Sequence, residues 1–264
     1  MNEKAYLVLE DGTVFEGTGF GARTTTTGEV VFDTSMTGYQ EMLTDPSFAG
    51  QLLTLTYPLV GNYGINEIDD ESAQVQVRGL VVREHCATPS HYQSRQTLHE
   101  YLSDAGIPGI ADIDTRAVTR RLRSTGVMMG VLTREMAPEQ AIEALRSAPD
   151  YASQQLAQSV STAAPYERTA VAQASTLRVA LLDCGVKRSI IRFLNANGCD
   201  VTVLPLSASS DEISALKPDG VLLSPGPGDP VHLGTMEDTL KSLLGTVPIM
   251  AICLGHQSVA RALG

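Results

Sequence analysis

The sequence predicts an α/β protein in two parts, a β-rich α+β domain over residues 1–150 and a parallel sheet with flanking helices over residues 177–264. Two observations support this fold class. Strand patterns with a few helices fill the first part, whereas apolar strand patterns alternate with helical ones in the second, as in parallel sheets covered on both faces. Between them, residues 151–176 are rich in Ala, Gln, Ser and Thr without periodicity, which predicts a linker or surface segment.

Composition narrows the class of protein. The chain has 264 residues, a formal net charge of -11 and 43% hydrophobic residues, enough for one large or two ordinary domains. Such a charge without a basic patch argues against nucleic acid and anionic membranes as partners. Short basic runs such as 120–123 fit a helix face or a subunit contact. The four cysteines lack metal or disulfide spacing, and no segment suits a signal peptide or membrane span, so we expect a cytoplasmic protein without a metal.

In the first part, a hairpin comes first. Residues 6–10 and 13–15 have strand character, and they flank Asp11-Gly12, a pair that suits a type I′ turn. Further strands are expected at 30–32, 52–56 and 77–82, and helical periodicity covers 94–105, 114–124 and 138–147. Asp114 is the expected N-cap of the second of these helices, and Gly126 its end.

The second part alternates regularly. Strands are expected at 178–183, 200–204, 220–223 and 247–252, with helices at 186–196, 211–216 and 235–244 between them. This order predicts a flavodoxin-like parallel sheet, in which ligands bind beyond the carboxyl ends of the strands. A loop rich in glycine and proline follows the third strand at this edge, and Cys253 follows the fourth.

Cys253 lies between an apolar run that predicts a fully buried strand, 247–252, and a helical pattern that continues through Leu263. This is the position of the serine in a nucleophile elbow, where the side chain is pushed out of the sheet. The N–H groups that open a helix favour a thiolate. Cys184 and Cys199, beside other strands, are expected to be core residues.

The loop 224–230 reads Ser-Pro-Gly-Pro-Gly-Asp-Pro. Two glycines between prolines make a rigid loop whose backbone N–H groups can approach a ligand closely. No Gly-Lys-Ser/Thr follows, so the loop is not a phosphate-binding P-loop. Combined with Cys253, it supplies a sulfur nucleophile and fixed donors for an oxyanion, the parts that acyl transfer needs.

These motifs resemble the Gly-Pro-Gly-Asp-Pro loop and Cys-x-Gly-His-Gln elbow of class I glutamine amidotransferases. Four further segments resemble the small subunit of carbamoyl-phosphate synthetase, in family order and spacing: 33–47, 55–64, 111–116 and 183–188. The resemblance covers essentially the whole chain, and it implies that Cys253 attacks the side-chain amide of glutamine. The residues it implies for binding glutamine and its oxyanion are Ser47, Gly226, Gly228, Leu254 and Gln257. His256 is interpreted as structural.

The resemblance also implies a partner. Ammonia released from glutamine would pass to a large synthetase subunit, which combines it with bicarbonate and ATP, with Mg, to make carbamoyl phosphate for arginine and pyrimidine biosynthesis. The small subunit itself would need no cofactor.

One part of the family pattern is missing from this sequence. The family completes its triad with a His and a Glu two residues apart, downstream of the elbow, and His85, His91, His99 and His232 do not match that pair. We therefore expect a C-terminally truncated amidotransferase domain that is inactive alone, because leaving-group protonation and thioester hydrolysis need a base.

Two other interpretations stay open. The chain resembles other class I amidotransferases at the elbow, such as those serving anthranilate or guanylate synthesis, but the segment 34–47 argues against them. A non-enzymatic scaffold subunit is favoured by the missing His and Glu, whereas the intact Cys253 argues against it.

Overall fold

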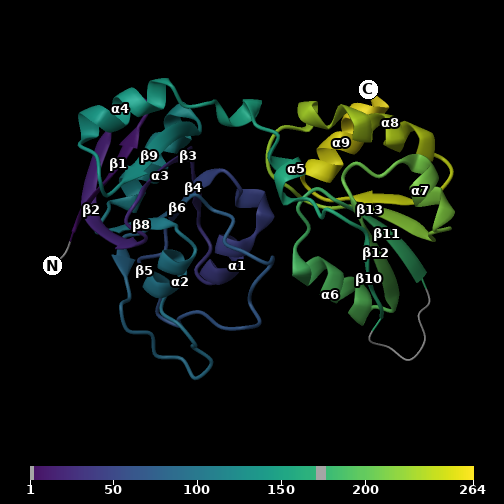
Figure 1. The fold of residues 1–264 in the computed structure, drawn as a ribbon, viewed down its shortest axis with the longest axis horizontal. Helices are drawn as coiled ribbons and strands as arrows, with labels where there is room; N and C mark the ends of the chain where they lie inside the picture. The colour runs from purple at the N-terminus through teal and green to yellow at the C-terminus, as the bar shows by residue number, and fades with distance from the viewer. Residues whose placement is uncertain (1–2, 171–176) are drawn as a thin grey trace. The chain divides into compact units, whose positions relative to one another are not determined.

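The computed structural model describes residues 3–170 and 177–264. The chain divides into two compact units, Met1–Tyr151 and Ala152–Gly264. Each unit has its own sheet and helices (Figure 1). Within the described ranges, no helix is long and apolar enough to cross a membrane.

A closed barrel forms the first unit. In spatial order its strands are β1 (Lys4–Leu9), β2 (Val14–Gly21), β8 (Pro108–Ala111), β6 (Gly79–Val81), β4 (Gln51–Leu55), β3 (Thr25–Asp33) and β9 (Met128–Thr133). The barrel closes because β9 pairs antiparallel with both β1 and β3. A separate parallel pair consists of β5 (Leu59–Val60) and β7 (Glu84–His85). Closure leaves the barrel without a free edge strand.

Short helices accompany the barrel: α1 (Tyr39–Thr44), η1 (Pro46–Phe48), α2 (Leu98–Asp104), α3 (Thr115–Thr125) and α4 (Pro138–Arg146). The predicted boundaries of α3 are confirmed. The Asp114 carboxylate accepts a hydrogen bond of 2.9 Å from the Ala117 N–H, and Gly126, with φ 95°, ends the helix.

The predicted type I′ turn between β1 and β2 is wrong, although the hairpin is present. The Leu9 N–H donates to the Thr13 carbonyl at 2.9 Å, so residues 10–12 form a three-residue loop. Gly12 has φ 85°, whereas Asp11 does not have a positive φ. A type I turn followed by one left-handed residue explains this loop, and the glycine supplies that residue.

The second unit contains a five-stranded sheet in the order β10-β12-β11-β13-β14. Its strands are β10 (Tyr166–Arg168), β11 (Leu177–Asp183), β12 (Cys199–Pro205), β13 (Gly220–Leu223) and β14 (Ile249–Ala251). The pairs among β11, β12, β13 and β14 are parallel, and β10 lies antiparallel along β12. The helices are α5 (Leu156–Val160), α6 (Arg188–Ala196), α7 (Ser210–Ala215), α8 (Gly234–Leu243) and α9 (Leu254–Leu263), with η2 (Tyr151–Ser153) and η3 (Pro230–Leu233).

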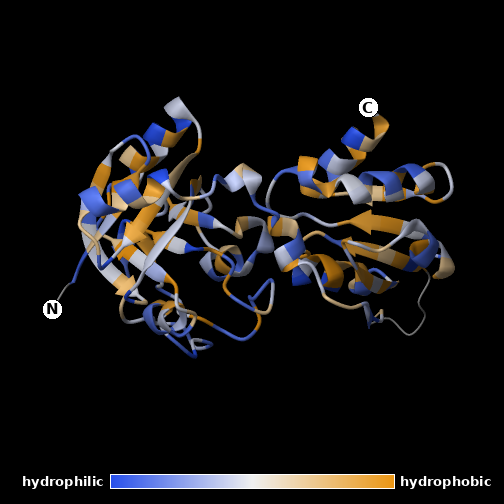
Figure 2. Cartoon of the chain, turned by 45° about the horizontal axis from the view of Figure 1, so that its top comes forward, coloured by the Kyte–Doolittle hydropathy of each residue, from blue (hydrophilic) through white to orange (hydrophobic). Residues whose placement is uncertain are grey.

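Alternating side chains of the strands bury two separate cores. Leu181 and Leu222 pack with α6 on one face, and Leu182 and Leu223 pack with α7, α8 and α9 on the other. Successive strand residues point to opposite faces, so each buried strand reads as a continuous apolar run. Figure 2 shows these strands mostly in the hydrophobic colour and the helices in both colours.

Two expectations for the second unit differ from the structure. The strand before Cys253 is not fully buried, because β14 pairs only with β13 among the described strands and Met250 is 64% exposed. Within the predicted linker 151–176, the described residues form η2, α5 and the edge strand β10. Residues 171–176 lie outside the described part of the chain.

Candidate active site

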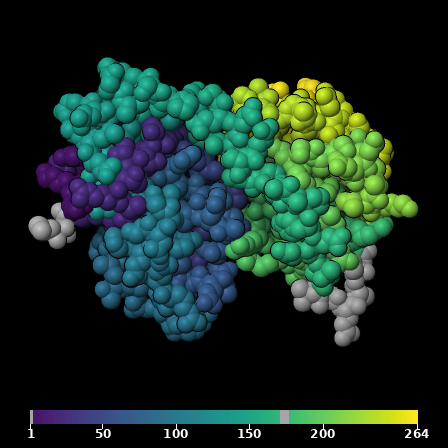
Figure 3. Space-filling model, in the orientation of Figure 1, coloured from purple at the N-terminus to yellow at the C-terminus, as the bar shows by residue number. Residues whose placement is uncertain are grey.

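Cys253 forms a sharp bend between β14 and α9. Its backbone has φ 51° and ψ -115°, which a residue with a side chain rarely adopts, at a cost of about 1–3 kcal/mol. Its thiol is exposed, and the Gln257 N–H donates to the Cys253 carbonyl at 3.0 Å, which starts the helix. The helix α9 reaches the surface of its unit (Figure 3).

The bend rests directly on the end of β13. The Ile252 N–H donates to the Leu223 carbonyl at 3.1 Å. At Gly255, a Cβ atom would lie 2.6 Å from the Leu223 Cβ and 2.9 Å from the Ser224 carbonyl oxygen, so only glycine fits without displacing the backbone. The Cys253 bend and the loop after β13 therefore share one support.

The loop after β13 packs on the backbone of Cys184, which directly follows β11. Ser224 is completely buried, and its hydroxyl accepts a hydrogen bond of 2.9 Å from the Cys184 N–H. A Cβ on Gly226 would collide with the Cys184 carbonyl oxygen. Gly228 has φ 87°, and the Asp229 carboxylate accepts from the Val231 N–H at 2.8 Å, which caps η3.

The backbone N–H groups of Gly226 and Leu254 are among the donors at this edge that have no protein acceptor among the described residues. Both residues are buried, and Leu254 is the first residue of α9. A buried, unpaired N–H group has a strong tendency to bind an anion, and the start of a helix adds positive potential. The pair is suited to stabilise an oxyanion.

The other site residues from the sequence divide between the units. Gln257 follows Cys253 by one helical turn, so the two exposed residues share a face of α9. Ser47 belongs to the first unit, where it is half-buried in η1 and its N–H donates to the Asp45 carboxylate at 2.8 Å. Contact between Ser47 and glutamine stays a prediction.

No histidine is hydrogen-bonded to the Cys253 sulfur in the part of the chain that the structure describes. His256 is exposed on α9. Three other histidines have contacts elsewhere: His85 stacks on Phe20 at 4.3 Å, His99 Nδ1 accepts from the Gly21 N–H, and His232 Nε2 lies 2.6 Å from the Ala152 carbonyl oxygen.

Buried polar groups at the end of β11 support the same edge. Asp183 accepts hydrogen bonds from the N–H groups of Thr162, Gly185 and Val186 at 2.8, 2.9 and 2.7 Å, and burial raises the pKa of its carboxyl. Burial and the neighbouring Asp183 raise the pKa of the Cys184 thiol to about 12. Cys184 and Cys199 are core residues, as predicted.

Sequence reasoning assigned no part in the site to Ser224 or Asp183. Asp183 ends one predicted strand and Ser224 directly follows another, and each precedes a loop that contains glycine. This position is the signal in the sequence that identifies them.

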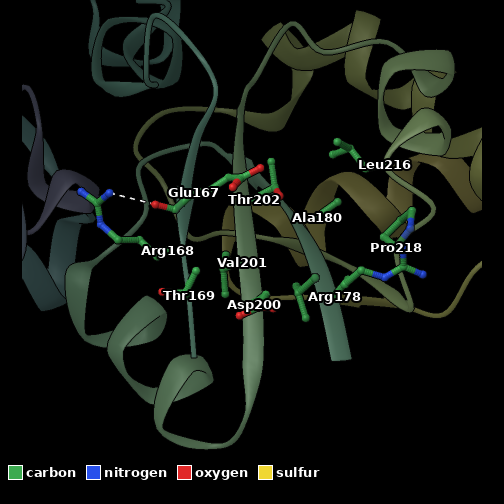
Figure 4. Close-up of a pocket in the computed structure, with 11 residues that line it drawn as sticks. Glu167, Arg168, Thr169, Arg178, Ala180, Asp200, Val201, Thr202, Leu216 and Pro218 are labelled. Atoms are coloured by element: carbon green, nitrogen blue, oxygen red, sulfur yellow. Dashed lines mark hydrogen bonds between the residues drawn. The ribbon is translucent and has the colours of Figure 1, made fainter. Parts of the chain in front are cut away.

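A pocket of about 240 Å³ lies at the opposite end of the strands (Figure 4). It is lined by the amino-terminal halves of β11 and β12, including Arg178 and Asp200, and by Arg168 from β10. The Arg168 guanidinium donates to the Glu167 carbonyl at 2.9 Å. This pocket is separate from the Cys253 edge. Over residues 3–170 and 177–264, no cluster of His, Cys, Asp or Glu is arranged to hold a metal ion.

Each of the two units contains a segment that matches a known protein family. Residues 7–132 match the family "Carbamoyl-phosphate synthase small chain, CPSase domain", and residues 180–264 match "Glutamine amidotransferase class-I". Among solved structures, an aminopeptidase from Aneurinibacillus sp. strain AM-1 covers 99% of this chain and 70% of its own at 11% identity, with a TM-score of 0.31, which is too low to support an argument.

Similar curated proteins are carbamoyl phosphate synthase small chains. That of Syntrophotalea carbinolica is 46% identical over 99% of this chain and 73% of its own length. The protein of Symbiobacterium thermophilum is 47% identical, over 97% of this chain and 71% of its own. That of Oceanobacillus iheyensis is 48% identical, over 99% of this chain and 70% of its own length. The chain therefore belongs to the carbamoyl phosphate synthase small chain family.

Proposed function

We propose that the chain is the glutamine-hydrolysing subunit of a carbamoyl phosphate synthase, with Cys253 as nucleophile. The observation that carries the proposal is an exposed thiol on a positive-φ bend. The N–H groups of two buried residues at the same edge, Gly226 and Leu254, have no protein acceptor in the described part of the chain. The family match gives this chemistry its substrate class. A different class I amidotransferase is disfavoured because residues 7–132 match the carbamoyl-phosphate synthase domain.

The reaction begins when the Cys253 sulfur, as thiolate, attacks the side-chain carbonyl carbon of glutamine. The new C–S bond leaves an anionic oxygen, which the N–H groups of Gly226 and Leu254 stabilise. Collapse breaks the C–N bond, and the nitrogen leaves as ammonia with one added proton, which balances the proton that the Cys253 thiol lost. Water then hydrolyses the γ-glutamyl thioester to glutamate and restores the thiol. Gly228, Gln257 and Ser47 are proposed to hold the glutamine.

The topology of the second sheet supports this location. Taking β11 as its first strand, the parallel order β12-β11-β13-β14 matches the first four positions of a flavodoxin-like sheet, and we propose that arrangement here. The strand order changes direction between β11 and β13. Ligands bind at such a switch point, beyond the carboxyl ends of the strands. Cys184 and Ser224 directly follow those two strands, and Gly226 lies two residues after Ser224.

The ammonia is proposed to pass to a large subunit that uses bicarbonate and ATP in the cytoplasm, supplying arginine and pyrimidine biosynthesis. Because no histidine contacts the Cys253 sulfur in the described ranges, we also propose that the polypeptide alone has little steady-state glutaminase activity.

The test uses 6-diazo-5-oxo-L-norleucine, a glutamine analogue that alkylates thiols with loss of nitrogen. We expect it to label Cys253 selectively, and we expect glutamine to block labelling. The half-buried Cys86 is the internal control. Equal labelling of both cysteines, or labelling that glutamine does not reduce, would contradict the proposal.

A scaffold subunit that only stabilises a synthetase using free ammonia is the second candidate, favoured by the absence of a base hydrogen-bonded to Cys253 in the described residues. In a complex with a large subunit, the Cys253→Ala variant distinguishes the two. A glutaminase subunit loses glutamine-dependent carbamoyl phosphate formation and retains the ammonia-dependent reaction, whereas a scaffold shows no glutamine dependence before or after the substitution.

A further inference from the structure

Ser224 joins the end of β11 to the loop that carries Gly226. It is fully buried, and its own N–H donates to the Leu182 carbonyl at 3.1 Å. Its hydroxyl accepts from the Cys184 N–H at 2.9 Å and donates to the Pro225 carbonyl at 2.8 Å. The Ser224 hydroxyl therefore accepts a hydrogen bond from the backbone after β11 and donates one to the backbone after β13.

The Pro225 carbonyl and the Gly226 N–H belong to the same peptide unit. The described part of the chain contains no cis peptide bond, so this unit is trans and its C=O and N–H point in opposite directions. Holding the oxygen at the Ser224 hydroxyl therefore directs the Gly226 N–H away from the buried side. Rotation of the peptide unit would break the hydrogen bond and present a carbonyl oxygen where an oxyanion needs a donor.

Neighbouring residues restrict the same peptide from its two sides. Pro225 has a fixed φ and no N–H of its own, so it offers no alternative donor. The Gly226 Cα lies against the Cys184 backbone, where a Cβ would collide with the carbonyl oxygen. The Gly226 N–H meanwhile donates to no acceptor in the described protein. The direction of the Gly226 N–H is therefore set by the orientation of the Pro225–Gly226 peptide, because no acceptor in the described protein holds it.

We propose that Ser224 is a positioning residue that fixes the orientation of the Gly226 N–H for the oxyanion. This inference rests on the proposed function. It assigns to Ser224 no contact with substrate, because the serine acts only through the Pro225–Gly226 peptide.

The experiment compares two reagents on the full chain and its Ser224→Ala variant. 6-Diazo-5-oxo-L-norleucine places a ketone oxygen at the oxyanion position, whereas iodoacetamide alkylates a thiol by simple displacement. We expect the variant to lose about 3- to 10-fold in the rate of Cys253 labelling by the first reagent, since a misdirected Gly226 N–H no longer gives its ketone oxygen one hydrogen bond. Labelling by iodoacetamide should stay within about 2-fold of wild type.

Two further variants separate positioning from support of the fold. Ser224→Thr keeps the hydroxyl and should restore the ratio of the two rates. Ser258→Ala is the matched control, because Ser258 is equally buried and donates to the Leu254 carbonyl, which is not part of either donor peptide. If Ser224→Ala does not fold, Ser224→Cys, a weak donor of similar size, replaces it.

The outcomes are distinguishable. If the wild-type chain shows no glutamine-protected labelling, the proposed function fails. If wild type shows it and the Ser224→Ala or Ser224→Cys variant reacts at the same rate, the positioning role is overturned. Equal slowing with both reagents, or failure of Ser224→Thr to restore the ratio, also overturns it, because a residue that only supports the fold would behave in this way.

Discussion

Cys253 combines an exposed thiol with a left-handed φ of 51°. A side chain at this position stores conformational strain that a glycine would not have. The position matters for chemistry because the bend pushes the sulfur out of the sheet. The stability of the fold therefore favours a glycine at position 253, whereas the proposed chemistry requires a cysteine there.

We predict that Cys253→Gly is more stable than Cys253→Ala by about 1–2 kcal/mol, because glycine adopts a positive φ without steric cost. Both variants remove the thiol, so their difference isolates the backbone term. Chemical denaturation followed by circular dichroism measures it. If alanine is equally stable or more so, the bend is not strained.

The buried thiol of Cys184 gives a pH prediction. Its pKa in the folded protein is raised to about 12 from an ordinary value of 9.0, mainly by burial. Because the unfolded chain loses this proton first, the contribution to stability is fully present below pH 9.0 and falls as the pH rises toward about 12. The loss is at most about 1.4 kcal/mol per pH unit.

Denaturation of wild type and Cys184→Ala at pH 8 and pH 10 tests this expectation. Wild type should lose more unfolding free energy than the variant between the two pH values. Identical pH dependence in both proteins would show that Cys184 titrates normally. In folded wild type, Cys184 should also resist thiol reagents at pH 8, whereas Cys253 reacts.

At the scale of single elements, α3 illustrates a boundary that local sequence specifies. Asp114 caps the helix through the Ala117 N–H, and Gly126 ends it. We predict that Asp114→Ala lowers the unfolding free energy by about 0.5–2 kcal/mol, whereas Asp114→Asn retains nearly all of it, because asparagine also accepts from the helix N–H groups. Thermal unfolding measures the difference, and equal losses would exclude a capping role.

Other elements depend on partners far along the chain. The strand β10 has the sequence Tyr-Glu-Arg and no apolar run, so its pairing with β12 was missed. The type I′ turn was wrong because loop length was set by the Leu9–Thr13 pair and not by the Asp-Gly dipeptide alone. In contrast, β11 and β13 were predicted because a strand buried on both faces must be apolar throughout.

At the scale of the whole molecule, the first unit contains a barrel closed by pairing of β1 with β9. Closure removes free strand edges, and the unit has its own buried cores. The Tyr151 hydroxyl donates to the Ala49 carbonyl at 3.3 Å, so this tyrosine belongs to the same unit.

We predict that a fragment of residues 1–151 folds by itself and unfolds cooperatively. Dispersed amide resonances and a sigmoidal denaturation curve would demonstrate it. Tyr151→Phe in the same fragment should cost about 0.5–1.5 kcal/mol, the value of one hydrogen bond. A fragment without cooperative unfolding would show that the barrel needs residues beyond Tyr151.

The sequence by itself determined the α/β class, the order of most strands and helices, and the pairing of a cysteine bend with a glycine–proline loop. These properties depend on local periodicity and residue type, which neighbouring residues encode. Tertiary structure decided the closure of the barrel and the exposure of Met250 on the edge strand β14. It also left the N–H groups of Gly226 and Leu254 without an acceptor among the residues that the structure describes. Pairing and burial depend on residues distant in sequence, so Ser224 acquires its proposed positioning role only when the ends of β11 and β13 come together.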